Sequence, residues 1–254
     1  MNKFAVIFLT VIFILFIWSF FIEPNLLVVT KYKINKFDGK KIVFVSDFHY
    51  GKNAKWRLKK LVKLINKQNP DLVLSGGDFV NGYDGNHTLD IHTYAEELSK
   101  INAPVITVLG NHDSWFDKFT IKNALENRGI KVLLNSNTIA SGIYIAGVED
   151  LQTGVPRADI ALENTEFPRI LISHSPDIYY DVKDDVDLIL AGHVHGGQVR
   201  MPFYGALLVP SIYGKKFACG IFNETGNTMI VTKGLGNSIL NVRFNAIPEI
   251  VVIE

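Results

Sequence analysis

The feature that most constrains the fold is a short run of Val, Ile and Leu that recurs six times and ends each time in a cluster of Gly, Asp, His or Asn. Continuous apolar runs of this length are typical of strands buried on both faces. The six runs are residues 41–49, 71–78, 105–113, 143–150, 169–176 and 186–195. Between the early runs, residues 54–68, 91–101 and 117–129 carry apolar side chains at helical spacing, with Asp117 and Gly129 predicted to begin and end the last helix. This alternation predicts an α/β fold with parallel strands and helices packed outside.

After residue 200 the helical patterns stop, and four strand-like pieces follow at 205–211, 216–222, 227–234 and 247–254. They indicate a more antiparallel ending, and we expect a layered sandwich with two sheets inside. A chain of 254 residues suits one sizeable domain. The formal net charge of +1 gives no strong field for nucleic acid, so we expect no nucleic-acid partner. Cys219 is the single cysteine of the sequence, which excludes an internal disulfide framework and a multi-cysteine zinc site.

The amino terminus carries nineteen uncharged residues, Phe4 to Ile22. At about 1.5 Å per residue they approach the roughly 30 Å of a hydrocarbon core, and Trp18 lies where an interfacial indole is favourable. The alternative is a cleaved signal peptide, but the run exceeds the usual apolar region and offers no pair of small residues for cleavage. We therefore predict three parts: a transmembrane anchor at 1–23, a connector at 24–40 and a folded domain at 41–254.

Lysines flank this apolar run unequally. Only Lys3 precedes it, whereas five lysines follow it before residue 42, with the acid Asp38 between them. The five are Lys31, Lys33, Lys36, Lys40 and Lys41. The positive-inside rule predicts a single-pass cell-membrane protein with a cytoplasmic domain. The alternative is that some of these lysines solvate an edge strand.

Polar side chains cluster at the ends of the apolar runs, where ligand sites of open α/β sheets collect. The candidate residues are Asp47, His49, Asp78, Asn111, His112, Asp113, His174, His193 and His195. Each cluster alone has an ordinary explanation, such as a turn after a strand or a single core histidine. Burying all of them without partners would cost a few kcal/mol for each unsatisfied group, whereas divalent metal ions satisfy them together. Carboxylate, imidazole and amide oxygen suit Mn, Fe or Zn, and the number of donors fits two ions with a bridging carboxylate.

The ordered set D-x-H, G-D, G-N-H-D, H and G-H-x-H, over about residues 41–195, resembles the calcineurin-like metallophosphoesterase family. The resemblance implies a four-layer α/β/β/α sandwich, here preceded by a single N-terminal transmembrane helix, and a centre of two divalent ions, with Mn favoured. It implies that one ion is held by Asp47, His49 and His195. The other is held by Asn111, His174 and His193, with Asp78 bridging. It also implies that His112 faces the phosphoryl group, stabilising its charge or protonating the leaving oxygen, and that Asp113 orients this imidazole.

The carboxyl-terminal sequence, from "GHVHGGQVRMPFYGALLVPSIYG" onward, is similar to a membrane-anchored phosphodiesterase branch of this family. Some members of the branch and its relatives cleave UDP-2,3-diacylglucosamine to lipid X and UMP in lipid A biosynthesis. The anchor and the apolar stretch 201–210 favour such a nucleotide-linked glycolipid, with membrane lipid as a second partner; the alternative is that 203–210 is a core strand. Arg200 and Arg243 are expected either to contact phosphate or to be surface charges.

Two other functions remain open from the sequence. One is a broad-specificity envelope phosphodiesterase, although exported members of the branch usually carry a twin-arginine signal that this sequence lacks. The other is a non-catalytic membrane tether, which the intact His112 and the complete ligand set disfavour.

Overall fold

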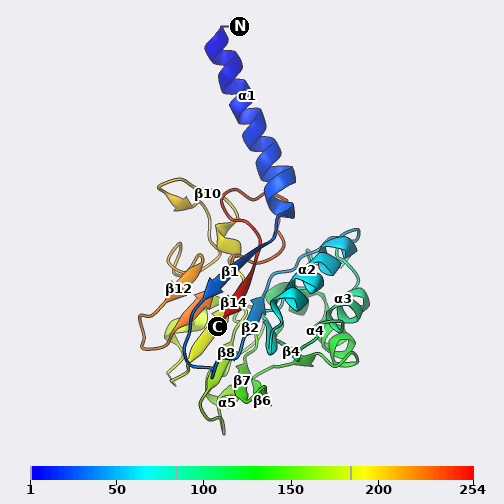
Figure 1. Ribbon diagram of the computed structural model, residues 1–254, viewed down its shortest axis with the longest axis vertical. Helices are drawn as coiled ribbons and strands as arrows, with labels where there is room; N and C mark the ends of the chain where they lie inside the picture. Colours follow the sequence, from blue (N-terminus) through cyan, green and yellow to red (C-terminus); the bar gives the residue numbers. More distant parts are fainter. Residues whose placement is uncertain (1, 84, 184) are drawn as a thin grey trace.

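Two β-sheets packed face to face form the centre of the structure, a computed structural model that describes residues 2–83, 85–183 and 185–254 (Figure 1). The first sheet has the order β1 (Val28–Tyr32), β14 (Glu249–Ile253), β2 (Ile42–Val45), β3 (Leu72–Ser75), β4 (Val105–Thr107) and β5 (Lys131–Val132). The second has the order β12 (Gly220–Phe222), β13 (Met229–Val231), β9 (Leu188–Ala191), β8 (Arg169–Ile172), β7 (Ile143–Gly147) and β6 (Ser136–Ala140). A separate small hairpin joins β10 (Arg200–Met201) to β11 (Gly205–Ala206).

The six apolar runs form buried strands, as predicted, because both faces of each sheet are covered. Along β2, Ile42 and Phe44 point into the core between the two sheets, while Val43 and Val45 pack under the helices. Strands β2 to β5 pair in parallel, as do β7 to β9. The last strands add the antiparallel pairs β12–β13 and β14–β2, but β13 pairs with β9 in parallel. The predicted antiparallel ending is therefore present in part.

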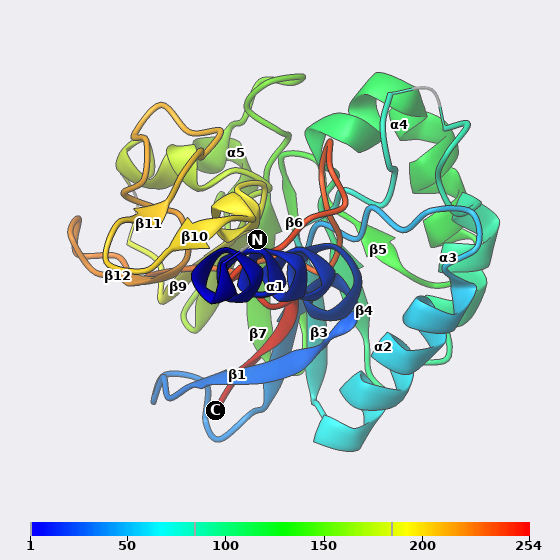
Figure 2. The same ribbon diagram turned by 90° about the horizontal axis from the view of Figure 1, so that it is seen from above.

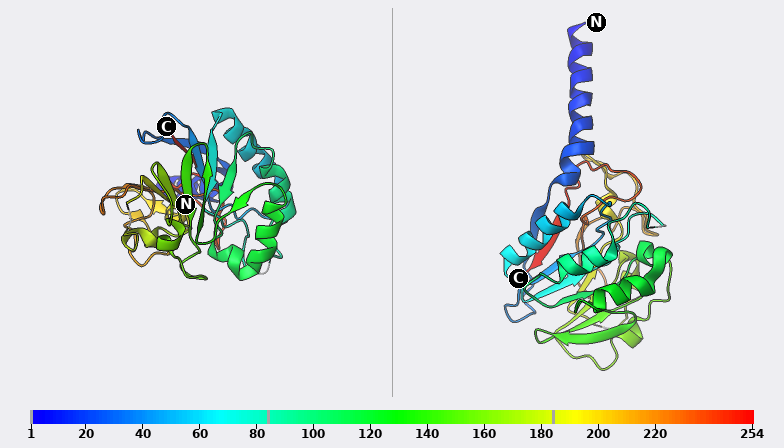
Figure 3. Two further views of the ribbon diagram at one scale, coloured as in Figure 1. Left: turned by 90° about the horizontal axis from the view of Figure 1, so that it is seen from below. Right: turned by 90° about the vertical axis from the view of Figure 1, so that its right-hand side faces the viewer.

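Helices cover the outer face of each sheet, which confirms the four-layer α/β/β/α arrangement (Figure 3). The first sheet is covered by α2 (Lys55–Gln68), α3 (Ile91–Leu98) and α4 (Asn111–Glu126). The second is covered by shorter pieces, α5 (Ala158–Ala161) and the 3-10 turn Pro176–Tyr180.

Both predicted signals of the 117–129 helix have a structural role. Asp117 is a kink within α4, and its carboxylate accepts the N–H groups of Phe119 and Thr120, so it caps the second half of the helix. Gly129 has φ +79° and ends the helix, with its N–H donating to the Glu126 carbonyl. The structure differs in beginning α4 six residues earlier, at Asn111.

The N-terminal helix α1 (Lys3–Ile17) stands clear of the body (Figure 1). It continues through a π-helical turn, Trp18–Ile22, and a 3-10 turn, Glu23–Asn25. The 23-residue segment Lys3–Asn25 is long and apolar enough to cross a membrane.

Residues 24–40, which we expected to connect anchor and domain, contribute strand β1 to the edge of the first sheet, paired in parallel with β14. Its sequence VVTKY is rich in β-branched residues, and it lies half-exposed. Lys31 belongs to this strand and forms an ion pair of 3.0 Å with Glu254. For Lys31, this agrees with the alternative that some of the lysines after the apolar run solvate an edge strand.

Candidate metal centre

All nine candidate residues meet in one cluster at the carboxyl ends of β2, β3, β4, β8 and β9, where the two sheets face each other. His112 is partly exposed, and the other eight are buried. The buried residues are Asp47, His49, Asp78, Asn111, Asp113, His174, His193 and His195. Residues separated by up to 146 positions touch, for example Asp47 Oδ1 and the N–H of His193 at 2.8 Å. The parallel strands explain this meeting, because their carboxyl ends share one edge of each sheet.

Five of the predicted ligands have left-handed backbone conformations. The φ angles are 57° at Asp47, 40° at His49, 57° at Asp78, 69° at His193 and 51° at His195. A non-glycine residue in this region costs on the order of 1–3 kcal/mol and persists where its surroundings hold it, most often at functional sites. The turns after β2, β3 and β9 therefore aim their side chains at one point at a conformational cost.

The first group of donors contains Asp47, His49 and His195, whose potential ligand atoms lie within 4.8 Å of one another. His49 Nδ1 donates to the Val80 carbonyl at 2.6 Å, which leaves Nε2 as the unprotonated nitrogen of the neutral ring. Among the described residues, Asp47 Oδ2 and His49 Nε2 are buried without a hydrogen-bond partner. Unsatisfied buried acceptors of this kind fit a metal ion, and a backbone carbonyl behind the imidazole is the usual support of a metal ligand.

The second group contains Asn111, His174 and His193. Asn111 Oδ1 lies 3.0 Å from His174 Nε2 and 3.2 Å from His193 Nδ1. His174 Nδ1 lies 2.8 Å from the Gly76 carbonyl, so this histidine also presents Nε2. His193 directs Nδ1 toward this group, while its Nε2 lies 3.2 Å from Gln152 Nε2 on the other side of the ring.

Asp78 lies between the two groups. Its Oδ2 is 3.2 Å from His49 Nε2 and 3.2 Å from His174 Nε2, while its Oδ1 accepts the N–H of His112 at 3.0 Å. One carboxylate oxygen therefore faces a nitrogen donor of each group.

The electrostatics of the cluster follow from burial. Burial alone would raise the pKa of Asp78, but the imidazoles of His174 and His49 hold it well below its usual range. Burial raises the pKa of Asp47, lowers that of His193 to about 4 and lowers that of His195 well below its ordinary value. Burial alone would lower the pKa of His49 and His174, but Asp78 raises both, so only His193 and His195 favour the neutral form that metal binding requires.

His112 stands at the exposed side of the cluster. Its Nδ1 lies 2.8 Å from the Gly82 carbonyl, which fixes the ring and leaves Nε2 free to act. The ring also contacts the aromatic side chains of Tyr83 and Trp115, with centroids 5.5 and 5.0 Å away. Burial lowers the pKa of His112, so its neutral form is favoured.

The expected role of Asp113 as the residue that orients His112 is wrong. Its carboxylate accepts four backbone N–H groups, those of Asp78, Phe79 and Val80 at 2.8–3.1 Å and that of Gly110 at 3.1 Å. The reason is its position: as the third residue of α4 it reaches back to the residue that precedes the helix. Asp113 therefore holds the turn that carries Asp78 against the start of α4, and the Gly82 carbonyl orients His112.

Two residues have roles that the sequence did not indicate. Gln152 contacts His193. In the sequence it is only a polar residue two positions after the apolar run that ends at Asp150, which does not mark it as part of a site. Arg243 is neither a phosphate ligand nor a surface charge, because it is fully buried and donates to the carbonyls of Gly236 and Ala246. Burial lowers the pKa of Arg243 to about 10.

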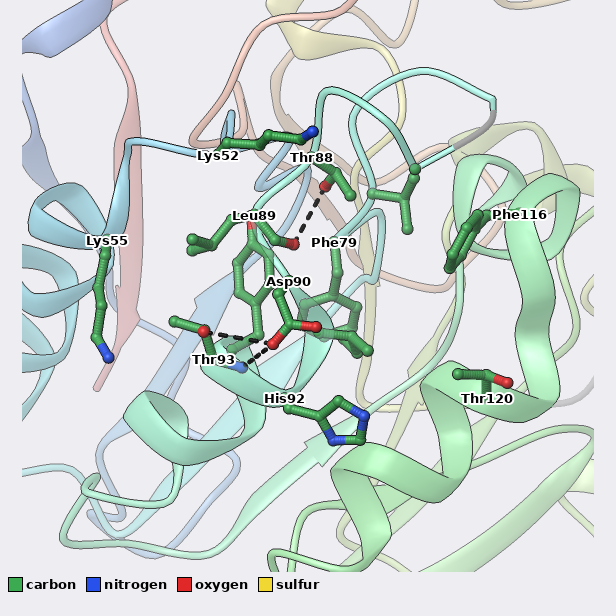
Figure 4. Close-up of a pocket in the computed structure, with 14 residues that line it drawn as sticks. Lys52, Lys55, Phe79, Thr88, Leu89, Asp90, His92, Thr93, Phe116 and Thr120 are labelled. Carbon is green, nitrogen blue, oxygen red and sulfur yellow. Dashed lines mark hydrogen bonds between the residues drawn. The ribbon is translucent and has the colours of Figure 1, made fainter.

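A cavity of about 530 Å³ lies next to the cluster, between α3, α4 and the segment after β3 (Figure 4). Its lining is mainly apolar, with Lys52 and Lys55 at its edge. None of the nine candidate residues lines it, but it includes Val80, whose carbonyl holds His49. The cavity and the metal centre thus share one backbone segment.

The family model for calcineurin-like phosphoesterases matches residues 40–197, the part that contains all nine residues. The chain belongs to this family. It is a metallophosphoesterase and hence a hydrolase, with a buried cluster of Asp and His able to hold metal.

Relatives extend the similarity beyond the matched region. The Bacillus subtilis protein called uncharacterized metallophosphoesterase YkuE is 35% identical over 252 residues, covering 91% of this chain and 86% of that protein. The Escherichia coli phosphodiesterase YaeI is 33% identical, covering 84% of this chain and 81% of that protein. A solved 5'-nucleotidase precursor from Thermus thermophilus has 15% identity and a TM-score of 0.50, covering 78% of this chain and 49% of that one; it shows a similar fold alone.

Proposed function

We propose that this metallophosphoesterase is a phosphodiesterase or pyrophosphatase that uses two divalent ions and is anchored in a cell membrane by the segment Lys3–Asn25. The observation that carries the two-ion centre is the position of Asp78 Oδ2, 3.2 Å from a donor nitrogen of each group. The anchor is supported by the length and composition of the segment and by the absence of any buried residue in α1.

The first ion is assigned to Asp47, His49 and His195, the second to Asn111, His174 and His193, with Asp78 shared. When bound, two such ions polarise phosphoryl oxygens and lower the pKa of water. The mixture of carboxylate, imidazole and amide oxygen supports Mn, with Fe and Zn as the other candidates.

The protein's own contribution to the chemistry comes from His112. With Nδ1 fixed by the Gly82 carbonyl, Nε2 is the atom that faces substrate, and the ring, which favours its neutral form, takes up a proton there before it donates to the leaving oxygen or to a charged phosphoryl oxygen. Asp113 acts on the geometry of the centre rather than on the proton of His112.

The substrate we propose is a nucleotide-linked glycolipid, UDP-2,3-diacylglucosamine, cleaved to lipid X and UMP. Support comes from the anchor and from the stretch 201–210, where Phe203, Leu207 and Leu208 are exposed rather than packed in a core strand. A broad-specificity phosphodiesterase is the second candidate, favoured by the similarity to the relative named phosphodiesterase YaeI.

The test uses the full chain purified in detergent with Mn²⁺. Release of UMP from UDP-2,3-diacylglucosamine, lost on adding EDTA and in a His112→Ala control, is the expected result. Rapid hydrolysis of bis(p-nitrophenyl) phosphate without UMP release would reject the glycolipid and support the second candidate.

The lysines after the span support a cytoplasmic domain, which fits a nucleotide-activated substrate. A reporter fused to the carboxyl terminus measures the side directly. An external reporter would contradict this orientation and favour an envelope phosphodiesterase.

A further inference from the structure

Exposed apolar side chains gather on two loops beside the base of the N-terminal helix. The hairpin loop, residues 200–213, contains Met201, Phe203, Tyr204, Leu207, Leu208 and Ile212 as exposed residues. The base loop, residues 236–246, contains Ile239, which is 93% exposed, and Leu240. Apolar side chains gathered in this way on a surface mark an interaction site rather than ordinary solvent contact.

The base loop is hydrogen-bonded to the last turns of the N-terminal helical segment. The N–H of Arg243 donates to the Ser19 carbonyl at 2.9 Å, and the N–H of Ala246 donates to Glu23 Oε1 at 2.6 Å. Ser19 belongs to the apolar run that ends at Ile22, so it lies about 4.5 Å inside the end of that run at 1.5 Å per residue. The base loop is therefore at the depth where hydrocarbon meets headgroups, if the run spans a bilayer.

The hairpin loop and the residue Gln198 just before it are bound in turn to the base loop. The N–H of Arg200 donates to the Phe244 carbonyl at 2.8 Å, and the N–H of Ser238 donates to Gln198 Oε1 at 2.7 Å. Seen along α1, the β10–β11 hairpin and the segment before β14 lie on two sides of the helix (Figure 2). The helix and both loops thus form one face of the molecule.

The chemistry of this face resembles that of a membrane interface. Tyr204 carries the ammonium group of Lys215 over its ring, 3.2 Å from the centroid. Trp18 at the end of the apolar run donates its indole N–H to Glu23 at 2.6 Å. Aromatic rings and lysines that extend to the headgroups are the usual residues at the edge of a bilayer.

We propose that the hairpin loop and the base loop insert into the interface of the bilayer that holds the anchor, so that the partner of this face is a lipid surface. The proposal rests on the membrane anchorage proposed above. It has a consequence for the metal centre. A cavity of about 270 Å³ is lined by His49, a predicted metal ligand, and by Ile239 and Leu240 of the base loop. The donors of the first ion are then reached from the level of the lipid headgroups.

The test measures the depth of single labels in the full chain. In a Cys219→Ala background, an NBD fluorophore is attached to Phe203→Cys or Ile239→Cys, and the protein is reconstituted into phosphatidylcholine–phosphatidylglycerol vesicles that contain doxyl-labelled lipid. Matched controls are Phe167→Cys, just before β8, and Ile139→Cys, in β6; they are the same residue types, exposed at 59% and 58%, outside both loops, and Phe13→Cys marks α1. Thermal unfolding of each labelled protein verifies that it is folded.

We expect blue-shifted emission and quenching by doxyl lipid at positions 203, 239 and 13, and neither effect at 139 or 167. Quenching at 13 without quenching at 203 and 239 would overturn the loop insertion while leaving the anchor intact. No quenching at position 13 would overturn the anchor, and the insertion with it. A blue shift at 203 and 239 without lipid quenching would assign the face to a second copy of the chain instead.

Discussion

Replacing Asp113 by Asn tests the role that the structure assigns to this carboxylate. Oδ1 accepts the N–H groups of Phe79 and Val80, and Oδ2 accepts those of Asp78 and Gly110. An asparagine has one acceptor oxygen, so whichever way its amide turns, two of the four N–H groups face an NH₂ group. At about 1.5 kcal/mol for each lost hydrogen bond to a charged group, the free energy of unfolding falls by roughly 3 kcal/mol. For a domain of this size that corresponds to a decrease in Tm of about 6–12 °C.

The same substitution should weaken metal binding, because the turn that Asp113 holds carries Asp78 and the Val80 carbonyl that orients His49. Loss of support behind metal ligands typically reduces affinity about 10–100-fold. Differential scanning fluorimetry of the full chain in detergent gives the Tm, and a Mn²⁺ titration gives the affinity. The matched control is Asp117→Asn, in the same helix, where asparagine caps the helix as well as aspartate and both measurements should stay unchanged.

A double-mutant comparison with His112→Ala separates the two roles of Asp113. If Asp113 positions the metal ligands, Asp113→Asn lowers the Tm and the Mn²⁺ affinity to the same extent with and without His112. If it orients the imidazole, the Tm and affinity do not change, and turnover falls only while His112 is present. That second pattern would refute the reasoning.

Three further predictions concern the same centre. His112→Ala should lower turnover of bis(p-nitrophenyl) phosphate about 10²–10⁴-fold, with the metal content by mass spectrometry unchanged. Gly110→Ala should abolish Mn²⁺ binding measured by calorimetry, because the new Cβ would overlap Asp78 Oδ1 and approach His174 Cε1 to 2.7 Å. The control Gly51→Ala should leave Mn²⁺ binding intact, because its Cβ would lie 3.5 Å from the nearest atom. EDTA should stop hydrolysis and lower the Tm, with both restored by Mn²⁺, since an ion at 100 times its Kd adds about 2.7 kcal/mol to the stability of the folded state.

One physical reason allows the sequence to predict both the strands and the clustering of the nine candidate residues of the metal centre. Val, Ile and Leu runs buried on both faces require parallel strands between covering layers, and parallel strands bring their carboxyl ends together. Asp117 and Gly129 are predicted equally well, because capping depends on residues a few positions away. Strand β1 is not recognised within 24–40, because its partner β14 lies more than 200 residues further along the chain.

The finer geometry of the centre could not be predicted, because it depends on backbone conformation. The glycines beside the donors, for example, act in two ways. Gly77, with φ +83°, does adopt a left-handed turn. Gly110 and Gly192 have ordinary backbones, and what they provide is space, since a Cβ at Gly192 would lie 2.7 Å from Asp47 Oδ2. The turns at the ligands are instead made by aspartate and histidine residues in left-handed conformations, which residue type alone does not reveal.

The metal centre and the apolar loops share short pieces of backbone, and this bears on the kind of substrate. Five residues after His195 the chain enters the hairpin loop. Gly236, whose carbonyl lies 3.3 Å from His195 Nδ1, precedes Ile239 by three residues, which span at most about 10 Å. The headgroup region on each side of a bilayer is roughly 5–8 Å thick, from the difference between its total and hydrocarbon thickness. If Ile239 lies in the interface as proposed, a phosphoester in a lipid headgroup would lie close to the donors while its acyl chains remained in the membrane. A water-soluble phosphoester would gain nothing from this placement, so the proposed insertion and the proposed lipid-linked substrate are consistent with each other.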